Sequence, residues 1–536
     1  MHYFFDKRRF LRPLTLLSLL MVIPSYLAFA QSLSESTEQL NVDELTTLSG
    51  GDLSLQQVVL ITLVNSPDIE QGQLDVKKAI GTAQIATGAF DINTSVSSNV
   101  RNNRPTSSND QDTQSLTFSL SERYRTGISA SASAGIGRTD SRFKTQDTNN
   151  LSNLKLSIAI PLLKGAGYVS AAASEKVALL KSQAEEYDYY HNVSKSLLNT
   201  TNAYWDYKAA VESFKIRQNS EQRVQSWVDT LKEEVKQGNK PDEANVSRIK
   251  AYLATKQKNT LTAEKEMSNT KSDLAVAMGI SDEDVANIGE PSEKFSTNWR
   301  ETAAKLEQQS SAAEWVVEAK EKRLDIKAAE LLQKSTEANL DKLEHNVLPQ
   351  LDLSLTASHS AIELGDGYSR YIDALNGDPR GDDVSATLKF SYPLGNNVAM
   401  GQRDVGRVSN MLNVIKLNDL KRKIGLGIAT YVDDLKSSLE EAAITLEALE
   451  HYNSSLEGSY NSYRDDLLTD PLAIFSLIDL DENLTEARID HIASLQEVAQ
   501  TTAQLRYQTG TILSHVDMDI EKLKLENMST IPGFDE

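Results

Sequence analysis

Two very long helical patterns dominate this sequence of 536 residues. In the first, apolar residues recur at three- and four-residue steps over 170–237, which is the spacing of a coiled coil. A helix of that length would measure roughly 100 Å, at 1.5 Å per residue. The pattern breaks at Gly238 and Pro241 and returns over 243–278, which predicts an antiparallel partner helix.

The C-terminal half contains the same arrangement. Long helices are expected over about 407–468 and over 476–513, on either side of a break at Asp470 and Pro471. Shorter helices, over about 65–88 and 322–347, precede the long ones, and each gives way to a two-residue alternation that indicates β-strands. The order of helix, strands, long helix, turn and long helix therefore occurs twice, which predicts two structural repeats per chain.

These repeats divide the chain into six expected segments. They are a signal peptide at 1–30, a flexible N-terminal segment at 31–52, a first repeat at 53–288, a connector at 289–310, a second repeat at 311–518 and an acidic flexible tail at 519–536.

The N-terminus has the pattern of a secretory signal peptide. Four basic residues precede a short apolar stretch at 14–23, and an A-x-A motif ends at Ala30. The expected cleavage site lies between Ala30 and Gln31. The alternative is an N-terminal membrane anchor, for which this apolar stretch is short.

The strand-like segments have the length that a tilted membrane-spanning strand needs, about 9–11 residues. No segment of the mature chain has the roughly 18 apolar residues of a membrane-spanning helix, so a membrane protein with this sequence would have to be a β-barrel. A few strands cannot close a barrel alone, and an open strand edge in lipid is energetically costly, so copies of the chain are expected to associate. The alternative is a small soluble sheet in the periplasm. The strand-like segments are 92–102, 115–123, 127–137, 151–161, 351–360 and 384–393.

The two β regions differ in length. The first runs from Phe90 to Pro161 and the second from Pro349 to Pro393, so the first has room for one more hairpin. Residues 125–127 are suited to its turn. We therefore expect two strands from the second half and up to four from the first. The alternative is two long strands that extend beyond the membrane.

Composition excludes several classes of function. The formal net charge of −21 argues against a nucleic-acid-binding protein, and the absence of cysteine excludes disulfides, thiolate metal sites and cysteine nucleophiles. The seven histidines are scattered without metal-ligand spacing, and no phosphate-binding loop is present. The chain is therefore expected to be neither an enzyme nor a cofactor-binding protein.

Three segments, together with their order along the chain, resemble the TolC-like outer-membrane efflux protein family. They are Ile160-Pro-Leu-Leu-Lys-Gly-Ala-Gly167, Leu348-Pro-Gln-Leu-Asp-Leu-Ser-Leu355 and Ser476-Leu-Ile-Asp-Leu480. The resemblance implies an α+β membrane protein: a homotrimer with a shared transmembrane β-barrel, continued through the periplasm by a long α-helical coiled-coil tunnel. It also implies a partner adaptor protein in the periplasm and an inner-membrane pump of the ABC or RND type, so that the chain would serve efflux or type I secretion.

The same resemblance implies sites. Asp479 and Glu482 match positions that form acidic rings at the periplasmic gate of the family, and Gly238, Pro241, Asp470 and Pro471 lie at the helix tips that dock on the adaptor. The alternative is that Asp479 and Glu482 face solvent, with Asp481 turned inward instead. The alternative function for the whole chain is a non-conducting structural or adhesive coiled-coil trimer of the cell envelope.

Overall fold

The structure is a computed structural model in which residues 51–103, 111–141, 148–236, 243–295, 312–366, 370–374, 380–463 and 471–515 are described. All of them belong to one compact unit, Leu48–Glu536. The expected cleavage site at Ala30 and Gln31 and the expected tail at 519–536 lie outside the described residues.

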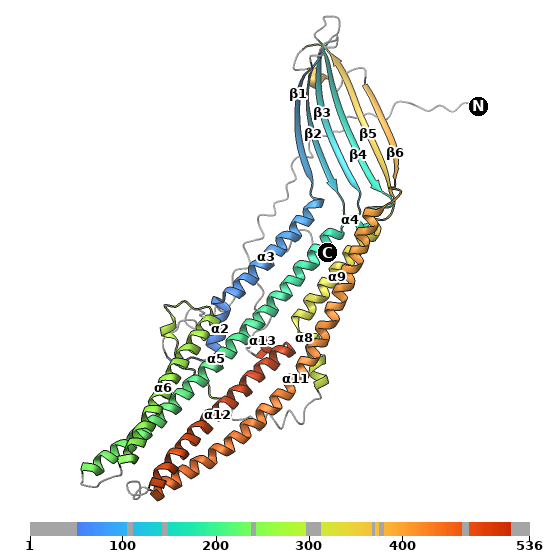
Figure 1. The fold of residues 1–536 in the computed structure, drawn as a ribbon. Coiled ribbons are helices and arrows are strands. Elements are labelled where there is room, and N and C mark those ends of the chain that lie inside the picture. Colours follow the sequence, from blue (N-terminus) through green and yellow to red (C-terminus); the bar gives the residue numbers. More distant parts are fainter. Residues whose placement is uncertain are drawn as a thin grey trace, which may run out of the picture. The chain divides into compact units, whose positions relative to one another are not determined.

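The long helices form where the coiled-coil spacing predicts them. α5 (Ala173–Lys236) packs against α6 (Glu243–Met278), and α11 (Asn397–Tyr463) packs against α12 (Pro471–Thr509). Each pair is an antiparallel hairpin, and α5 also lies along α12, so that the two hairpins run side by side (Figure 1).

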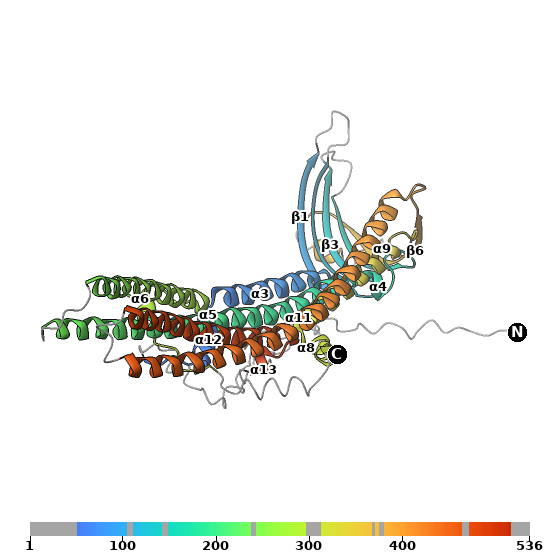
Figure 2. The ribbon, with the colours of Figure 1, turned by 60° about the horizontal axis from the view of Figure 1, so that its bottom comes forward.

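The shorter helices connect the hairpins to the sheet. α3 (Pro67–Thr87) and α9 (Leu324–His345) both pack against α5, and α9 also packs against α11 (Figure 2). Two further helices, α2 (Leu55–Asn65) and α8 (Ala312–Lys322), were not predicted. α2 is fixed at its start by a capping box between Ser54 and Gln57. The remaining short elements are η1 (Gly88–Phe90), α4 (Tyr168–Ala171), η2 (Val285–Asn287), α10 (Arg370–Asp373) and α13 (Ile512–His515).

Six strands form one antiparallel sheet in the order of the sequence. Each strand pairs with the next one along the chain, including the pair β4–β5, which joins the two halves. The strands are β1 (Asn93–Asn103), β2 (Gln111–Arg123), β3 (Ser129–Ser141), β4 (Asn149–Pro161), β5 (Gln350–Leu364) and β6 (Arg380–Ser391).

The extra hairpin predicted in the first half is confirmed. β2 and β3 are joined by a tight turn in which the Tyr124 amide donates to the Ile128 carbonyl and the Gly127 amide donates to the Tyr124 carbonyl. Gly127 has φ +91°, and a Cβ there would lie 2.3 Å from the Gly165 carbonyl oxygen. Only glycine fits this position. Four strands therefore come from the first half and two from the second, and the reading of two long strands is excluded.

The helical core lies in separate clusters along the hairpins. Where α3 packs on α5, Tyr189, Tyr190 and Leu197 of α5 are buried together with residues of α3. Toward the far end, Val224 and Leu231 of α5 are buried with residues of α6 and α12. Burial of these apolar faces, rather than helix propensity, stabilises helices of such length.

Candidate functional site

The sheet has one apolar face. Because side chains alternate along a strand, the pairing register assigns every residue to one of two faces. One cross-strand row runs through Thr94, Leu120, Ala132, Leu156, Ala357 and Val384. The large side chains of this face are exposed in the chain, with Leu156 at 61% and Val384 at 83%. Other exposed members of the face are Val96, Val100, Leu116, Phe118, Leu154, Ile158, Leu355, Leu388 and Phe390.

The opposite face is polar and consists mostly of small side chains. The neighbouring row runs through Ser95, Ser119, Ser133, Lys155, Ser358 and Asp383. Serine, threonine and glycine fill most other positions of this face on the four central strands. An apolar face of this size could not remain in water, whereas a hydroxyl-rich face could, so the sheet is suited to separate an apolar phase from water.

Charged and aromatic residues mark the two ends of the apolar face. At the end away from the helices, Arg138 pairs with Asp366 and Arg370 pairs with Glu363. At the end near the helices, the alternation along β2 and β6 places Tyr124 and Tyr392 on the apolar side of the sheet, and both are half-exposed. Tyrosine is typical of the boundary between lipid and water. No described helix is both long enough and apolar enough to cross a membrane.

The sheet is open at both edges. β1 and β6 are its outermost strands, and among the described residues no strand pairs with the outer edge of either. Both edge strands carry the apolar face, through Val96 and Val100 on β1 and through Val384 and Leu388 on β6. An open edge of this kind is a template for pairing with another strand.

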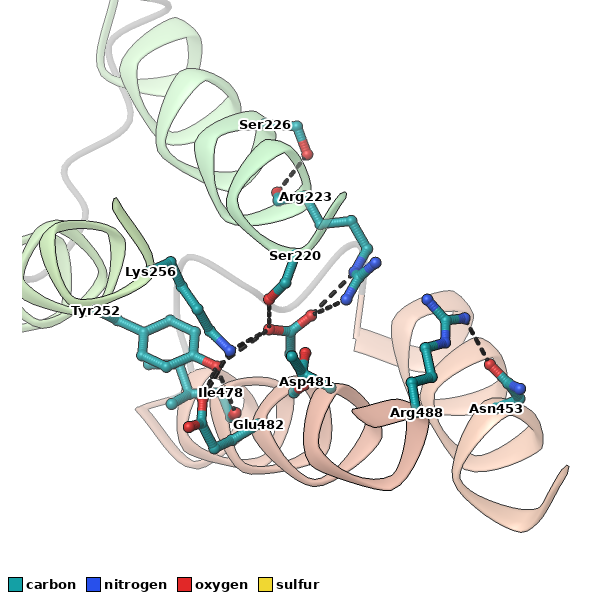
Figure 3. Close-up of polar contacts among 11 residues, drawn as sticks. Ser220, Arg223, Ser226, Tyr252, Lys256, Asn453, Ile478, Asp481, Glu482 and Arg488 are labelled. Carbon is teal, nitrogen blue, oxygen red and sulfur yellow. Dashed lines mark hydrogen bonds and ion pairs between the residues drawn. The ribbon is translucent and has the colours of Figure 1, made fainter. Parts of the chain in front are cut away.

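A second site is a buried ionic network between the two helical hairpins (Figure 3). Asp481 on α12 is fully buried. Its Oδ1 accepts hydrogen bonds from Nε and Nη2 of Arg223 on α5, at 2.9 and 2.7 Å, and its Oδ2 accepts one from Ser220 Oγ at 2.7 Å. Lys256 Nζ, on α6, lies 3.2 Å from the same Oδ2. One carboxylate on α12 therefore joins both helices of the other hairpin.

Glu482 extends this network. Its Oε2 lies 2.6 Å from Lys256 Nζ and accepts a hydrogen bond of 2.9 Å from the Tyr252 hydroxyl. Burial, reinforced by the charges of Asp481 and Glu482, raises the pKa of Tyr252. Burial also opposes the ionisation of Asp481, but the charges of Arg223 and Lys256 outweigh it and hold the Asp481 pKa below the usual 3.8. Asp481 is therefore ionised at neutral pH, where it holds Arg223 and Lys256.

The residues predicted for the gate lie in two different environments. Asp479 is exposed and accepts a hydrogen bond of 3.2 Å from Asn483 Nδ2, whereas Glu482 is engaged by Lys256 and Tyr252. Asp481, the alternative gate residue, is turned toward α5 and α6. Of the predicted docking tips, Gly238, Pro241 and Asp470 lie outside the described residues, and Pro471 is the first residue of α12.

Sequence reasoning missed the partners of Asp481. Arg223 lies on α5, and Tyr252 and Lys256 lie on α6, so the network becomes visible only once three helices are placed side by side. A weak signal was available, because Tyr252 and Lys256 are four residues apart and therefore share one face of α6. Among the described residues, no group of three or more His, Asp or Glu side chains could hold a metal ion.

Comparison with known proteins gives matches by structure only. No family model and no curated protein matches the sequence. The fold is similar to that of the outer membrane protein VceC from Vibrio cholerae (TM-score 0.62, 15% identity, 85% of this chain and 96% of that one). It is also similar to the CmeC outer membrane channel of Campylobacter jejuni (TM-score 0.62, 12% identity, 87% and 90%) and to the outer-membrane channel OprN (TM-score 0.60, 14% identity, 85% and 90%). The resemblance predicted from the sequence is thus confirmed for the fold, and the chain has the fold of the TolC-like outer-membrane channels.

Proposed function

We propose that this chain is the subunit of an outer-membrane channel, in which three copies form an exit duct that carries substrates out of the cell. The observation that carries this proposal is the six-stranded sheet with one apolar face, one hydroxyl-rich face and two open edges. If β6 of one copy pairs with β1 of the next, the ring has no edge, the apolar face meets lipid and the polar face lines a water-filled lumen.

An uncovered stripe on α11 supports association with further copies. Val398, Val405, Val408, Leu412 and Ile415 follow the steps of a coiled-coil seam and are all more than half exposed. Coiled-coil seams are normally buried by another helix. In the proposed trimer a neighbouring copy covers this stripe, and the paired hairpins of three copies form the periplasmic tunnel.

The proposal includes export, location and partners. The signal peptide, cleaved after Ala30, would deliver the chain to the periplasm, from where it assembles in the outer membrane. A periplasmic adaptor protein and an inner-membrane pump of the ABC or RND type would dock at the helix tips near Gly238, Pro241, Asp470 and Pro471. The solved relatives are described as outer-membrane channels, which supports a non-enzymatic transport function.

Substitution on the two faces of β4 tests the proposal. Arginine at Leu156 would place a charge on the lipid-facing side, at a cost of about 2–4 kcal/mol per copy near the middle of the membrane. Arginine at the adjacent Ser157 would face the lumen. We expect Leu156→Arg to lower the amount of folded trimer in outer-membrane fractions at least several-fold, whereas Ser157→Arg assembles and changes ion selectivity in planar bilayers.

Recordings in planar bilayers also distinguish the proposed channel from the alternative function. A non-conducting structural or adhesive trimer would give no single-channel conductance with either the parent protein or Ser157→Arg. Equal assembly of both arginine variants would contradict a membrane location for the sheet.

We also propose that the tip of α12 forms the periplasmic gate, with Asp479 of three copies as an uncompensated acidic ring. Glu482 would contribute less to the field of the ring, because Lys256 lies 2.6 Å from it. Asp479→Ala should therefore reduce cation selectivity in planar bilayers by about half or more, since a ring of carboxylates favours cations. Glu264→Ala, on the outward helix α6, removes the same charge and should leave selectivity unchanged. An equal effect of both variants would place Asp479 outside the lumen.

A further inference from the structure

The β2–β3 hairpin differs from the other four strands in its relation to the helices. β1 follows α3, β4 leads into α4 and α5, β5 follows α9 and β6 leads into α11. At the same end of the sheet, β2 and β3 are instead joined by the turn at 124–128. In the described part of the second half, only α10 stands between β5 and β6, and no counterpart of this hairpin is present.

The turn of this hairpin is fixed to the start of the long helix. Arg125 donates two hydrogen bonds, at 2.9 and 2.8 Å, to the carboxylate of Glu175 on α5, whose side chain is 1% exposed. The Gly167 amide donates to the Thr126 carbonyl at 3.0 Å, and the Arg125 guanidinium lies 5.0 Å from the centre of the Phe90 ring. A buried carboxylate needs such a partner, so the hairpin is a fixed part of the junction between sheet and helices.

The hairpin also continues both faces of the sheet. Phe118 of β2 pairs with Val96 of β1, and Ala134 of β3 pairs with Leu154 of β4, so the apolar face runs across it without a change of parity. On the opposite face the hairpin contributes serine, threonine and glycine, which are small. In both faces, β2 and β3 therefore resemble the strands on either side of them.

The width of the sheet with the hairpin matches the helical wall on which it stands. Six strands about 4.8 Å apart, tilted by about 40°, extend over about 38 Å, whereas four such strands extend over about 25 Å. The helices that meet the sheet, α3, α5, α9 and α11, would extend over about 36 Å at interaxial distances of 8–10 Å. The hairpin therefore makes the sheet as wide as the four helices.

We propose that the hairpin enlarges the pore, so that the outer-membrane barrel has eighteen strands. This inference rests on the proposed trimer. Eighteen strands give a backbone-to-backbone diameter of about 36 Å, against about 24 Å for the twelve strands that remain without the hairpin. With small side chains on the hairpin's lumen face, such a barrel takes solutes as wide as a pair of packed helices, each of which is 10–12 Å across.

Single cysteines test this assignment, since the chain has no cysteine of its own. Thr117→Cys and Phe118→Cys place a thiol on either face of β2, and Thr356→Cys and Leu355→Cys form the matched pair on β5. In intact outer membranes we expect a membrane-impermeant maleimide to label Cys at 117 and 356 at least tenfold faster than Cys at 118 and 355. After extraction in detergent and unfolding, all four should label equally.

The two pairs distinguish the two possible failures. Alternating labels on β5 with equal labels on β2 would mean that the hairpin lies outside the membrane wall, which overturns this inference and leaves the channel function intact. Equal labels on both pairs would overturn the channel function itself.

Deletion of residues 111–147 gives an independent measurement. It joins β1 to β4 through residues 104–110 and keeps Val96 and Leu154 on the same face. Because the deletion removes Arg125, it is combined with Glu175→Gln, so that no unpaired carboxylate stays buried. We expect this variant to remain trimeric. Polyethylene glycol about 25 Å across, added from the side away from the helices, should reduce the conductance of the parent but not of the variant. If polymer of this size is excluded equally from both channels, the hairpin does not widen the pore. Should the variant fail to assemble, the cysteine labels decide the question.

Discussion

Asp481→Asn is expected to detach the tip of α12 from the other helical hairpin. The substitution keeps the shape of the side chain but removes the charge that holds Arg223 and Lys256. Lys256 is 3% exposed, and this buried cation loses Asp481 and keeps Glu482 of its two carboxylate partners. Breaking a buried pair in this way costs about 3–5 kcal/mol. Because the cost is local, we expect faster hydrogen exchange in α12 around 474–488 and a lowered melting temperature.

In the proposed channel, release of the α12 tip should also change conductance. If α12 forms the gate, its release should raise the single-channel conductance and the fraction of time that the channel is open. Asp229→Asn is the matched control, because Asp229 pairs with Lys232 on the surface and its loss should not measurably change stability or conductance. Unchanged exchange and conductance in Asp481→Asn would show that the network does not restrain the tip.

The loss of stability caused by Asp481→Asn should become smaller at low pH. Because the Asp481 pKa is lowered below 3.8 by its cationic partners, its contribution to stability is complete above that value. The contribution is lost only as the pH falls further, through the pKa of the folded state. The difference between parent and variant should therefore stay constant from pH 8 to pH 5 and shrink below about pH 4.

Much of the fold could be predicted from local patterns. The end of α5 at Lys236 and the start of α6 at Glu243 lie close to the predicted bounds, since coiled-coil spacing and helix-breaking residues are both properties of neighbouring positions. The lengths of the two β regions allowed up to four strands in the first half and two in the second, and the structure has this number rather than the alternative of two long strands. The turn at 125–127 could be located because only a few positions in that stretch suit a tight turn.

The errors at helix ends have local physical causes. α12 begins at Pro471 rather than at the expected Ser476, because proline fits the first turn of a helix, where its missing N–H is not needed. α11 begins at Asn397, ahead of the expected Arg407, and the residues between include exposed apolar ones such as Val398 and Val405. Those residues follow the seven-residue step of a coiled-coil seam, but they are not buried within one chain.

The candidate sites could be predicted only in part. The alternation of the strands showed that two faces exist, but only the register showed that the apolar residues of all six strands share one face. The family resemblance pointed to Asp479 and Glu482, yet the strongest electrostatic contacts belong to Asp481 between them. Its partners lie more than 200 positions away in the sequence, on α5 and α6, and no local pattern links such positions.

Gly279→Ala is expected to have the largest effect of any single methyl group added to a glycine in the helical region. Gly279 follows the last residue of α6 with φ +73°, a conformation that side chains other than glycine rarely adopt. A Cβ there would lie 2.4 Å from the Asn65 carbonyl oxygen and 2.9 Å from the Ser66 Cα, which are backbone atoms between α2 and α3 and cannot turn aside. Backbone strain and overlap together should cost about 4 kcal/mol.

Gly81→Ala is the matched control, because Gly81 lies inside α3 with open space around its Cα, and alanine there should stabilise the helix by up to about 1 kcal/mol. Thermal unfolding of the detergent-extracted protein should therefore shift in opposite directions for the two variants. A Gly279→Ala variant that melts with the parent would show that the end of α6 does not pack against the α2–α3 link as described.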